Sequence, residues 1–466
     1  MGIKLDWEVE EDDGWDEVPE DQALAAARRA RRRRLLNIES TVDAETLALR
    51  LGSRSAFLAL QVEGDDWRSA QSATFDAYQA LAPRLDVRSE VIASEIDGET
   101  ARVTLREVLD GQPYQVTWFY EHTRQGWQHA PPPAAAWGER LQSTSGEFVY
   151  SYYEADSDFV QALMPRLEGW WQQACELTGC HPSPRTPVHV VVHPDPLTGA
   201  GWSADGRARL SLPSPLFGRL PEGGQVLGAE ATATVTRAVA GRWAQALTYP
   251  DRWKPPNPSS DLPWVQAELA VWLQHKLDES APASGFFSPL EDEFGSGFMP
   301  AFIEAIRRDD RLVPALQAVT GVSAADLPVD WTGYIAYRLR EEARLLDAQD
   351  HEAARLYREP GSRRQPEGVI DEAIEAVALP GSIEVIGVEP AGDVLLAEVR
   401  FERRFSSRDE PVAVVGFEPF RWDAGGLLHT RLEFRHWGEE RTAASEHFDL
   451  VYYERDAAAV RGLLEQ

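Results

Sequence analysis

The sequence predicts a multidomain α+β protein in which two related α+β modules flank a mostly helical region with a small sheet. The chain has 466 residues, more than the roughly 250 to 300 that one hydrophobic core serves, so two to four domains are expected. Apolar residues make up 43% of the chain, enough for ordinary packed cores. Near each end, alternating strand patterns are found, and the two ends are similar in sequence.

The end of the chain repeats a segment near its beginning. Residues 127–163 align without a gap on residues 427–463 at a constant offset of 300. The alignment places His129 on His429, and the Trp-Gly-Glu and Tyr-Tyr-Glu tripeptides of the two segments coincide. Such a match predicts an internal duplication. We expect the second copy to be shorter at its front, unless residues 371–377 supply a remnant of a helix.

The first module is expected over residues 40–144. Residues 44–51 and 67–81 have helical spacing, whereas three later segments alternate apolar and polar residues at period two. These segments are residues 84–94, 100–109 and 113–122. Asp-Gly pairs between them predict tight turns, so one curved antiparallel sheet packed on helices is expected.

The middle of the chain, residues 145–345, is expected to be helical apart from a few strands. The region opens with an aromatic segment at residues 148–153, and strands are predicted at residues 188–193 and 208–212. Helices are predicted at residues 157–178, 229–247, 264–277, 300–307, 312–320 and 331–358. We interpret the charged stretch 338–358 as a solvated helical connector. Residues 346–368 are therefore assigned to connector and linker, and residues 369–466 to the second module.

Residues 1–39 form an acidic and then arginine-rich arm, expected to be disordered or helical. The cluster from Arg28 to Arg34 fits a solvated or acid-paired arm, which we favour, or membrane association, or a nucleic-acid arm. A formal net charge of −30 argues against a nucleic-acid partner. The chain is expected to be soluble as written, on either side of a bacterial membrane.

The two cysteines, Cys175 and Cys180, lie five residues apart. They fit either a small disulfide loop or a pair of reduced thiols. We favour the thiols, because disulfide scaffolds are small and rich in cysteine.

In the central region, Leu-Pro-Trp-Val-Gln-Ala-Glu-Leu-Ala at residues 262–270 is followed by Thr-Gly-Val-Ser at residues 320–323 and by Trp331. These segments and their order resemble the gluzincin group of zinc peptidases, and most closely the bacterial peptidase MA-like family. The resemblance covers about residues 148–342. It implies that Glu268 stands where such peptidases place their third zinc ligand.

The zinc motif that this resemblance implies is missing. The helix expected at residues 229–247 contains no histidine, whereas the chemistry needs two histidines one turn apart and a neighbouring general base. Its best equivalent begins at Thr236 and Arg237. We therefore expect no catalytic residues, no metal and no cofactor. Glu268, Arg237 and Thr236 are candidates for the vacated site, where Arg237 would neutralise Glu268.

The helices and strands expected in the two modules are accompanied by Gly98, residues 101–105, residues 118–120 and Gly126 with Trp127. With these residues, the modules resemble the cone of nuclear-transport-factor-two-like or ketosteroid-isomerase-like proteins. The resemblance implies a curved sheet around a pocket, in a fold that hosts both enzymes and inert binding domains. The pattern places Glu121 and Asp76 on the surface. Trp118, Trp127 and Trp137 are expected in the core rather than as a ligand platform.

Three hypotheses for function follow. We favour a non-catalytic pseudopeptidase whose central cleft binds a peptide or protein partner. The alternatives are an enzyme of another class with a small-molecule pocket in one cone module, and a structural assembly subunit. Relatives with the architecture implied by the resemblance are anchored by one membrane span, with the modules outside.

Overall fold

The computed structural model is a mixed α+β protein with several sheets. It describes residues 38–179, 187–194, 200–203, 208–223, 227–248, 260–360, 378–391, 393–403, 410–423, 426–430, 436, 438–444, 449–457 and 460–461. The arginine cluster lies outside these residues. Of the helices described, none is long and apolar enough to cross a membrane. The chain divides into two compact units, one of residues 1–165 and 186–231 and one of residues 166–185 and 232–466.

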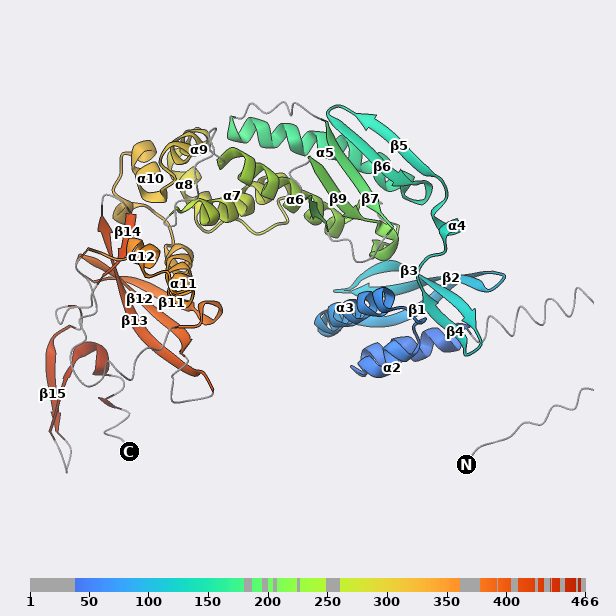
Figure 1. The fold of residues 1–466 in the computed structure, drawn as a ribbon, viewed down its shortest axis with the longest axis horizontal. Helices are drawn as coiled ribbons and strands as arrows, with labels where there is room; N and C mark the ends of the chain where they lie inside the picture. The colour runs from blue at the N-terminus through green and yellow to red at the C-terminus, as the bar shows by residue number, and fades with distance from the viewer. Residues whose placement is uncertain are drawn as a thin grey trace, which may run out of the picture. The chain divides into compact units, whose positions relative to one another are not determined.

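The first unit begins with the helices and sheet of the first module (Figure 1). A helix over residues 38–50 is followed by α2 (Arg54–Ala59), α3 (Asp65–Leu81), β1 (Leu85–Asp97), β2 (Thr100–Leu109), β3 (Gln112–Thr123) and β4 (Gly126–Ala130). The strands are antiparallel, and β3 also pairs with the short β10 (Leu220–Pro221). Helices and strands share one core, in which Phe57 and Phe75 meet Trp118 and Trp127.

A second sheet in this unit follows the order β5-β6-β7-β9-β8. Its strands are β5 (Arg140–Ser145), β6 (Phe148–Tyr153), β7 (Val188–His193), β8 (Gly201–Trp202) and β9 (Arg209–Pro213). Strand β7 pairs in parallel with both β6 and β9. Alternate residues of β6 and β7 are buried, as their period-two pattern predicts.

The second unit contains most of the helices. They are α6 (Ala229–Thr248), whose first residues belong to the first unit, and α7 (Leu262–Leu277), α8 (Phe287–Phe294), α9 (Phe298–Asp309), α10 (Leu312–Thr320), α11 (Thr332–Asp347) and α12 (His351–Ala354). The helix α5 (Ser157–Thr178) contributes its later part, where Trp171 contacts Trp243 edge to face. Helix α7 buries Trp264, Leu269 and Trp272, and its Gln266 and Gln274 side chains donate hydrogen bonds to α6.

The second module repeats the sheet of the first. Its strands are β11 (Glu384–Ala391), β12 (Val394–Arg403), β13 (Val412–Asp423) and β14 (Gly426–His429), paired in that order. The hairpin of β15 (Glu440–Ala444) and β16 (Asp449–Tyr453) follows in the same register as β5 and β6, shifted by 300 residues. The structure therefore contains the repeated elements that the aligned sequences predict.

The front of the second module lies in α11 and α12, which the sequence analysis assigned to the middle region and the connector. Backbone N–H groups of Val62 and Glu359 donate to the carbonyls of His129 and His429 in the two copies. The interpretation of residues 338–358 as solvated holds only in part: Arg344, His351 and Arg355 are exposed, but Arg338 is 2% exposed and Glu342 is 4% exposed. Their charges are paired inside the protein, so a charged composition did not mean contact with water. The alternative remnant at residues 371–377 lies outside the described residues.

Cys175 is in a disulfide, and the only other cysteine in the sequence is Cys180. The preference for free thiols was therefore wrong. That preference came from the composition of small disulfide scaffolds, which does not bear on one short loop in a large chain. Cys180 itself lies outside the described residues.

Replacing Gly138 with alanine is expected to destabilise the first unit by about 1 to 3 kcal/mol. Gly138 has φ 69 and ψ −156, a region open only to glycine, and an added Cβ would lie 2.8 Å from Cβ of Glu154. Gly438 stands in the same relation to Glu454 in the second module. Urea denaturation measures the loss. The control is Gly241→Ala inside α6, which meets nothing within 4 Å and should stabilise by about 0.5 to 1 kcal/mol.

Candidate functional site

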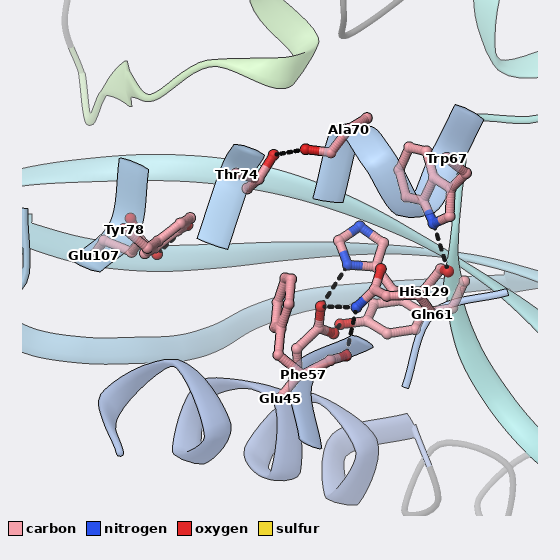
Figure 2. A network of polar contacts seen from close by, with 10 residues as sticks. Glu45, Phe57, Gln61, Trp67, Ala70, Thr74, Tyr78, Glu107 and His129 are labelled. Atoms are coloured by element: carbon pink, nitrogen blue, oxygen red, sulfur yellow. Dashed lines mark hydrogen bonds and ion pairs between the residues drawn. The ribbon is translucent and has the colours of Figure 1, made fainter. Parts of the chain in front are cut away.

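A buried carboxylate, Glu45, joins the first helix of the first module to its sheet. Its side chain is fully buried and lies 2.9 Å from Nε2 of Gln61 and 2.9 Å from the hydroxyl of Tyr120. The third partner is Nδ1 of His129, at 2.6 Å (Figure 2). The amide and the hydroxyl donate to the carboxylate, so Glu45 acts as an acceptor and Nδ1 of His129 carries the third hydrogen.

The ring of His129 is held in one orientation. It stacks on Trp118 and Tyr120 with ring centroids 5.1 Å and 5.2 Å away, and Trp67 meets it edge to face at 5.4 Å. Figure 2 shows one ring nitrogen directed at Glu45 and the other pointing away from it, on the side of α3. With the hydrogen on Nδ1, Nε2 of a neutral imidazole is a hydrogen-bond acceptor.

His129 lines a cavity of about 200 Å³ beneath α3. Its walls are largely aromatic and include Phe57, Trp67, Tyr78 and Trp118. Gln71 also lines the cavity and is 5% exposed, and within the described part of the chain its side-chain oxygen has no hydrogen-bond partner. The cavity therefore combines aromatic walls with the acceptors of Gln71 and His129, and Thr74, Thr117 and Arg219 also line it.

A second buried carboxylate, Glu107, holds the other end of this cavity. It is 1% exposed and accepts hydrogen bonds from the hydroxyl of Tyr78 at 2.7 Å, from Ser89 at 3.0 Å and from Nε of Arg219 at 2.8 Å. Burial, with Glu107 adding to it, raises the pKa of Tyr78 well above its usual value, so the hydroxyl stays protonated. Arg219 lies over the Tyr78 ring at 4.5 Å and forms part of the cavity wall.

The equivalent histidine of the second module, His429, is bonded at both ring nitrogens. Nδ1 lies 2.9 Å from Glu342 and Nε2 lies 2.8 Å from Glu418, which occupies the position of Trp118. Burial acts to lower the pKa of His429, but the charges and hydrogen bonds of Glu342 and Glu418 raise it to about 10. His429 is therefore a cation that donates from both nitrogens and has no lone pair for a ligand.

A larger groove of about 750 Å³ also lies in the first unit, beside Trp137. Its charged residues are Glu95, Asp97, Arg102 and Glu154, all of them exposed. Exposed charges are strongly hydrated, and none of these is oriented by a buried partner as His129 is. We therefore consider the smaller cavity the better candidate site.

The residues proposed for a vacated peptidase site do not form the expected ion pair. Glu268 is half-buried and accepts a hydrogen bond from Ser284 at 3.1 Å, and burial raises its pKa while this bond lowers it. Arg237 is exposed, and no ion pair links it to Glu268. The buried hydroxyl of Thr236 donates within its own helix, to the carbonyls of Thr232 and Ala233. Whether this is a vacated site stays a prediction.

Sequence reasoning identified only part of the candidate site. It marked His129 as a repeat position, and it expected Trp118 in the core, where Trp118 is 6% exposed and also lines the cavity. It did not find Glu45. The sequence did contain a signal for it. In each copy a glutamate precedes the repeated histidine by a similar number of residues: Glu45 precedes His129 by 84, and Glu342 precedes His429 by 87. No group of three or more histidine, cysteine or acidic residues placed to hold a metal ion occurs among the described residues.

Comparison of the chain with family models, with curated proteins and with solved structures found no match in any of the three. The functional argument therefore depends on the geometry of the first module.

Proposed function

We propose that the first module binds a small organic molecule, of about one ring, in the cavity beside His129. The observation that carries the proposal is the oriented ring nitrogen of His129 at an aromatic cavity. This is the small-molecule hypothesis among the three drawn from the sequence. It agrees with the resemblance to cone-shaped modules, which hold their ligands between helices and a curved sheet.

The size of the cavity limits the ligand. An apolar protein cavity of about 150 Å³ holds one benzene molecule. The cavity of about 200 Å³ therefore suits one planar ring that carries small substituents or a small fused ring. A peptide side chain of that size would also fit, but its backbone would need an open groove along the cavity.

The walls of the cavity define the chemistry of the ligand. Aromatic walls favour a planar ring, which stacks or meets them edge to face. The side-chain oxygen of Gln71 and Nε2 of His129 both accept hydrogen bonds. The ligand should therefore be a planar ring that carries a donor such as a hydroxyl or a ring N–H, because each buried acceptor left unpaired costs binding free energy.

The pseudopeptidase interpretation of residues 148–342 is a separate proposal. It is supported by the half-buried Glu268 with its raised pKa, a carboxyl group that a peptide N–H or amine could reach. It predicts that a peptide or protein binds in the second unit, and it does not depend on ligand binding by the first module.

Binding of para-nitrophenol to the full chain, measured by isothermal titration calorimetry, tests the proposed function. We expect saturable binding, and weaker binding of para-nitrotoluene, which has no donor. Thr74 lines the cavity, so Thr74→Phe should fill it and weaken binding at least tenfold. The matched control is Ala73→Phe on the exposed side of α3. Absence of binding, or equal binding by the two variants, would overturn the proposal.

A further inference from the structure

We infer that the cavity is a catalytic site in which His129 removes a proton from the bound ring, with Glu45 as its positioning residue. This inference rests on the proposed binding of a small planar ligand. It adds an activity, because a binding pocket needs neither a fixed tautomer nor a buried carboxylate behind its imidazole.

The hydrogen bonds around Glu45 set the tautomer of His129. Gln61 and Tyr120 satisfy the carboxylate from two directions, and the remaining contact is Nδ1 of His129 at 2.6 Å. In the neutral imidazole, Nε2 therefore carries the lone pair. When Nε2 takes a proton, the new positive charge on the ring lies beside the carboxyl group of Glu45, which is already in place.

The surroundings of the ring keep this lone pair directed at the cavity. Trp118 and Tyr120 stack on His129, and Trp67 donates its indole N–H to the backbone carbonyl of His129 at 3.2 Å. A flip of the imidazole would break the contact between Nδ1 and Glu45, and tilting the ring out of its plane would break both stacking contacts. The base is therefore held in position before a ligand arrives, which lowers the cost of reaching a reactive geometry.

The second module uses the same position differently. In that module Glu418 caps Nε2 of the equivalent histidine, and the result is a permanent ion pair. In the first module Trp118 stands at the position of Glu418 and leaves Nε2 at the cavity. The histidine at this position is therefore held in ion pairs in the second module, whereas in the first module it lies at a cavity, where it can act as a base.

The proton removed belongs to a carbon acid. Protons on oxygen and nitrogen already exchange rapidly with water, so a positioned base would accelerate their removal little. A C–H bond on a planar ring, acidified by a neighbouring heteroatom or carbonyl group, is slow to ionise and gains from such a base. In the step, Nε2 forms a bond to hydrogen and the C–H bond breaks. Its electron pair stays on the ligand, and the proton later returns to the ligand or to water. No oxidant or metal enters the balance.

Ring opening of nitrobenzisoxazole provides the test, because its acidic ring C–H takes the place of the O–H or N–H donor at Nε2 of His129. A base removes its ring C–H proton, the electron pair forms the nitrile, and the N–O bond breaks to give a coloured phenolate. We expect the full chain to accelerate this reaction over the same concentration of free imidazole. His129→Gln should lower the rate at least a hundredfold. His122→Gln, on the neighbouring strand β3, should not change it.

Two further readouts separate catalysis from structure. Glu45→Gln should lower the rate about tenfold or more and shift the pH profile, and Glu45→Asp should restore part of the rate. Calorimetry with para-nitrophenol reports binding in every variant. If wild type and His129→Gln bind this probe and open the ring equally fast, the catalytic inference is wrong and the proposed function stands. If wild type does not bind the probe, the proposed function fails first.

A measurement on the unaltered protein covers the case in which His129→Gln does not fold. Bound para-nitrophenol that transfers its proton to His129 absorbs as the phenolate at a pH where the free compound is neutral. We expect this absorbance at saturation. A bound probe that keeps the neutral spectrum at every pH below its own pKa would also overturn the inference.

Discussion

Replacement of Asp261 with alanine is expected to lower the free energy of unfolding of the second unit by about 3 to 5 kcal/mol. Asp261 is fully buried and accepts hydrogen bonds from the Tyr334 hydroxyl at 2.9 Å and the Leu312 N–H at 2.8 Å. It also lies 3.3 Å from Nη1 of Arg338, which is 2% exposed. Removing the carboxylate would leave a buried cation without its counter-charge.

Further variants test whether this loss of unfolding free energy comes from the missing charge of Asp261. Asp261→Asn keeps the shape of the side chain and one acceptor oxygen, so it should cost less than alanine. Asp309→Ala, at the exposed end of α9, should change the unfolding free energy by no more than about 0.5 kcal/mol. Urea denaturation measures all three. A loss below about 1 kcal/mol for Asp261→Ala would mean that Arg338 finds water or another partner.

The strands and long helices could be predicted because their signals are local. Residues 157–178, 188–193 and 312–320 were assigned with the bounds that the structure has. Asp110 and Gly111 have positive φ at the turn between β2 and β3, as an Asp-Gly pair predicts. The short helices α2 and α8 were missed, because six or eight residues span too few turns to show a period.

The buried ionic networks could not be predicted because their partners are far apart along the chain. Asp261 and Arg338 are separated by 77 residues, and Glu45 and His129 by 84. A single sequence shows that a residue is charged but not whether it has a buried partner. For the same reason residues 338–358 were interpreted as solvated, although Arg338 and Glu342 lie inside the protein.

Replacement of Glu342 with glutamine is expected to destabilise the second module by about 3 to 5 kcal/mol. Glu342 accepts hydrogen bonds from Nδ1 of His429 and from Arg358. Burial acts to raise its pKa, but these two cations lower it to about 2. Without Glu342, two cations would share a mostly buried site with Glu418 as the remaining counter-charge. Glu352→Gln, on the exposed side of α12, is the control.

The pH dependence of the second module gives this prediction an independent check. The raised pKa of His429 contributes stability that is complete below its ordinary value of 6.5 and is lost as the pH rises through about 10. The lowered pKa of Glu342 contributes stability that is complete above 4.5 and is lost as the pH falls towards 2. The ion pair should therefore stabilise most between pH 4.5 and 6.5.

Hydrogen exchange of α11 and β14, measured by mass spectrometry from pH 6.5 to pH 10, reports this stability locally. Wild type should lose protection beyond the intrinsic effect of pH, because its folded state binds a proton that the unfolded state has released. Glu342→Gln should start less protected and lose less, since the carboxylate nearest Nδ1 of His429 is gone. If both proteins lose protection in parallel, the histidine does not titrate with the fold, and the second module is held by its sheet core instead.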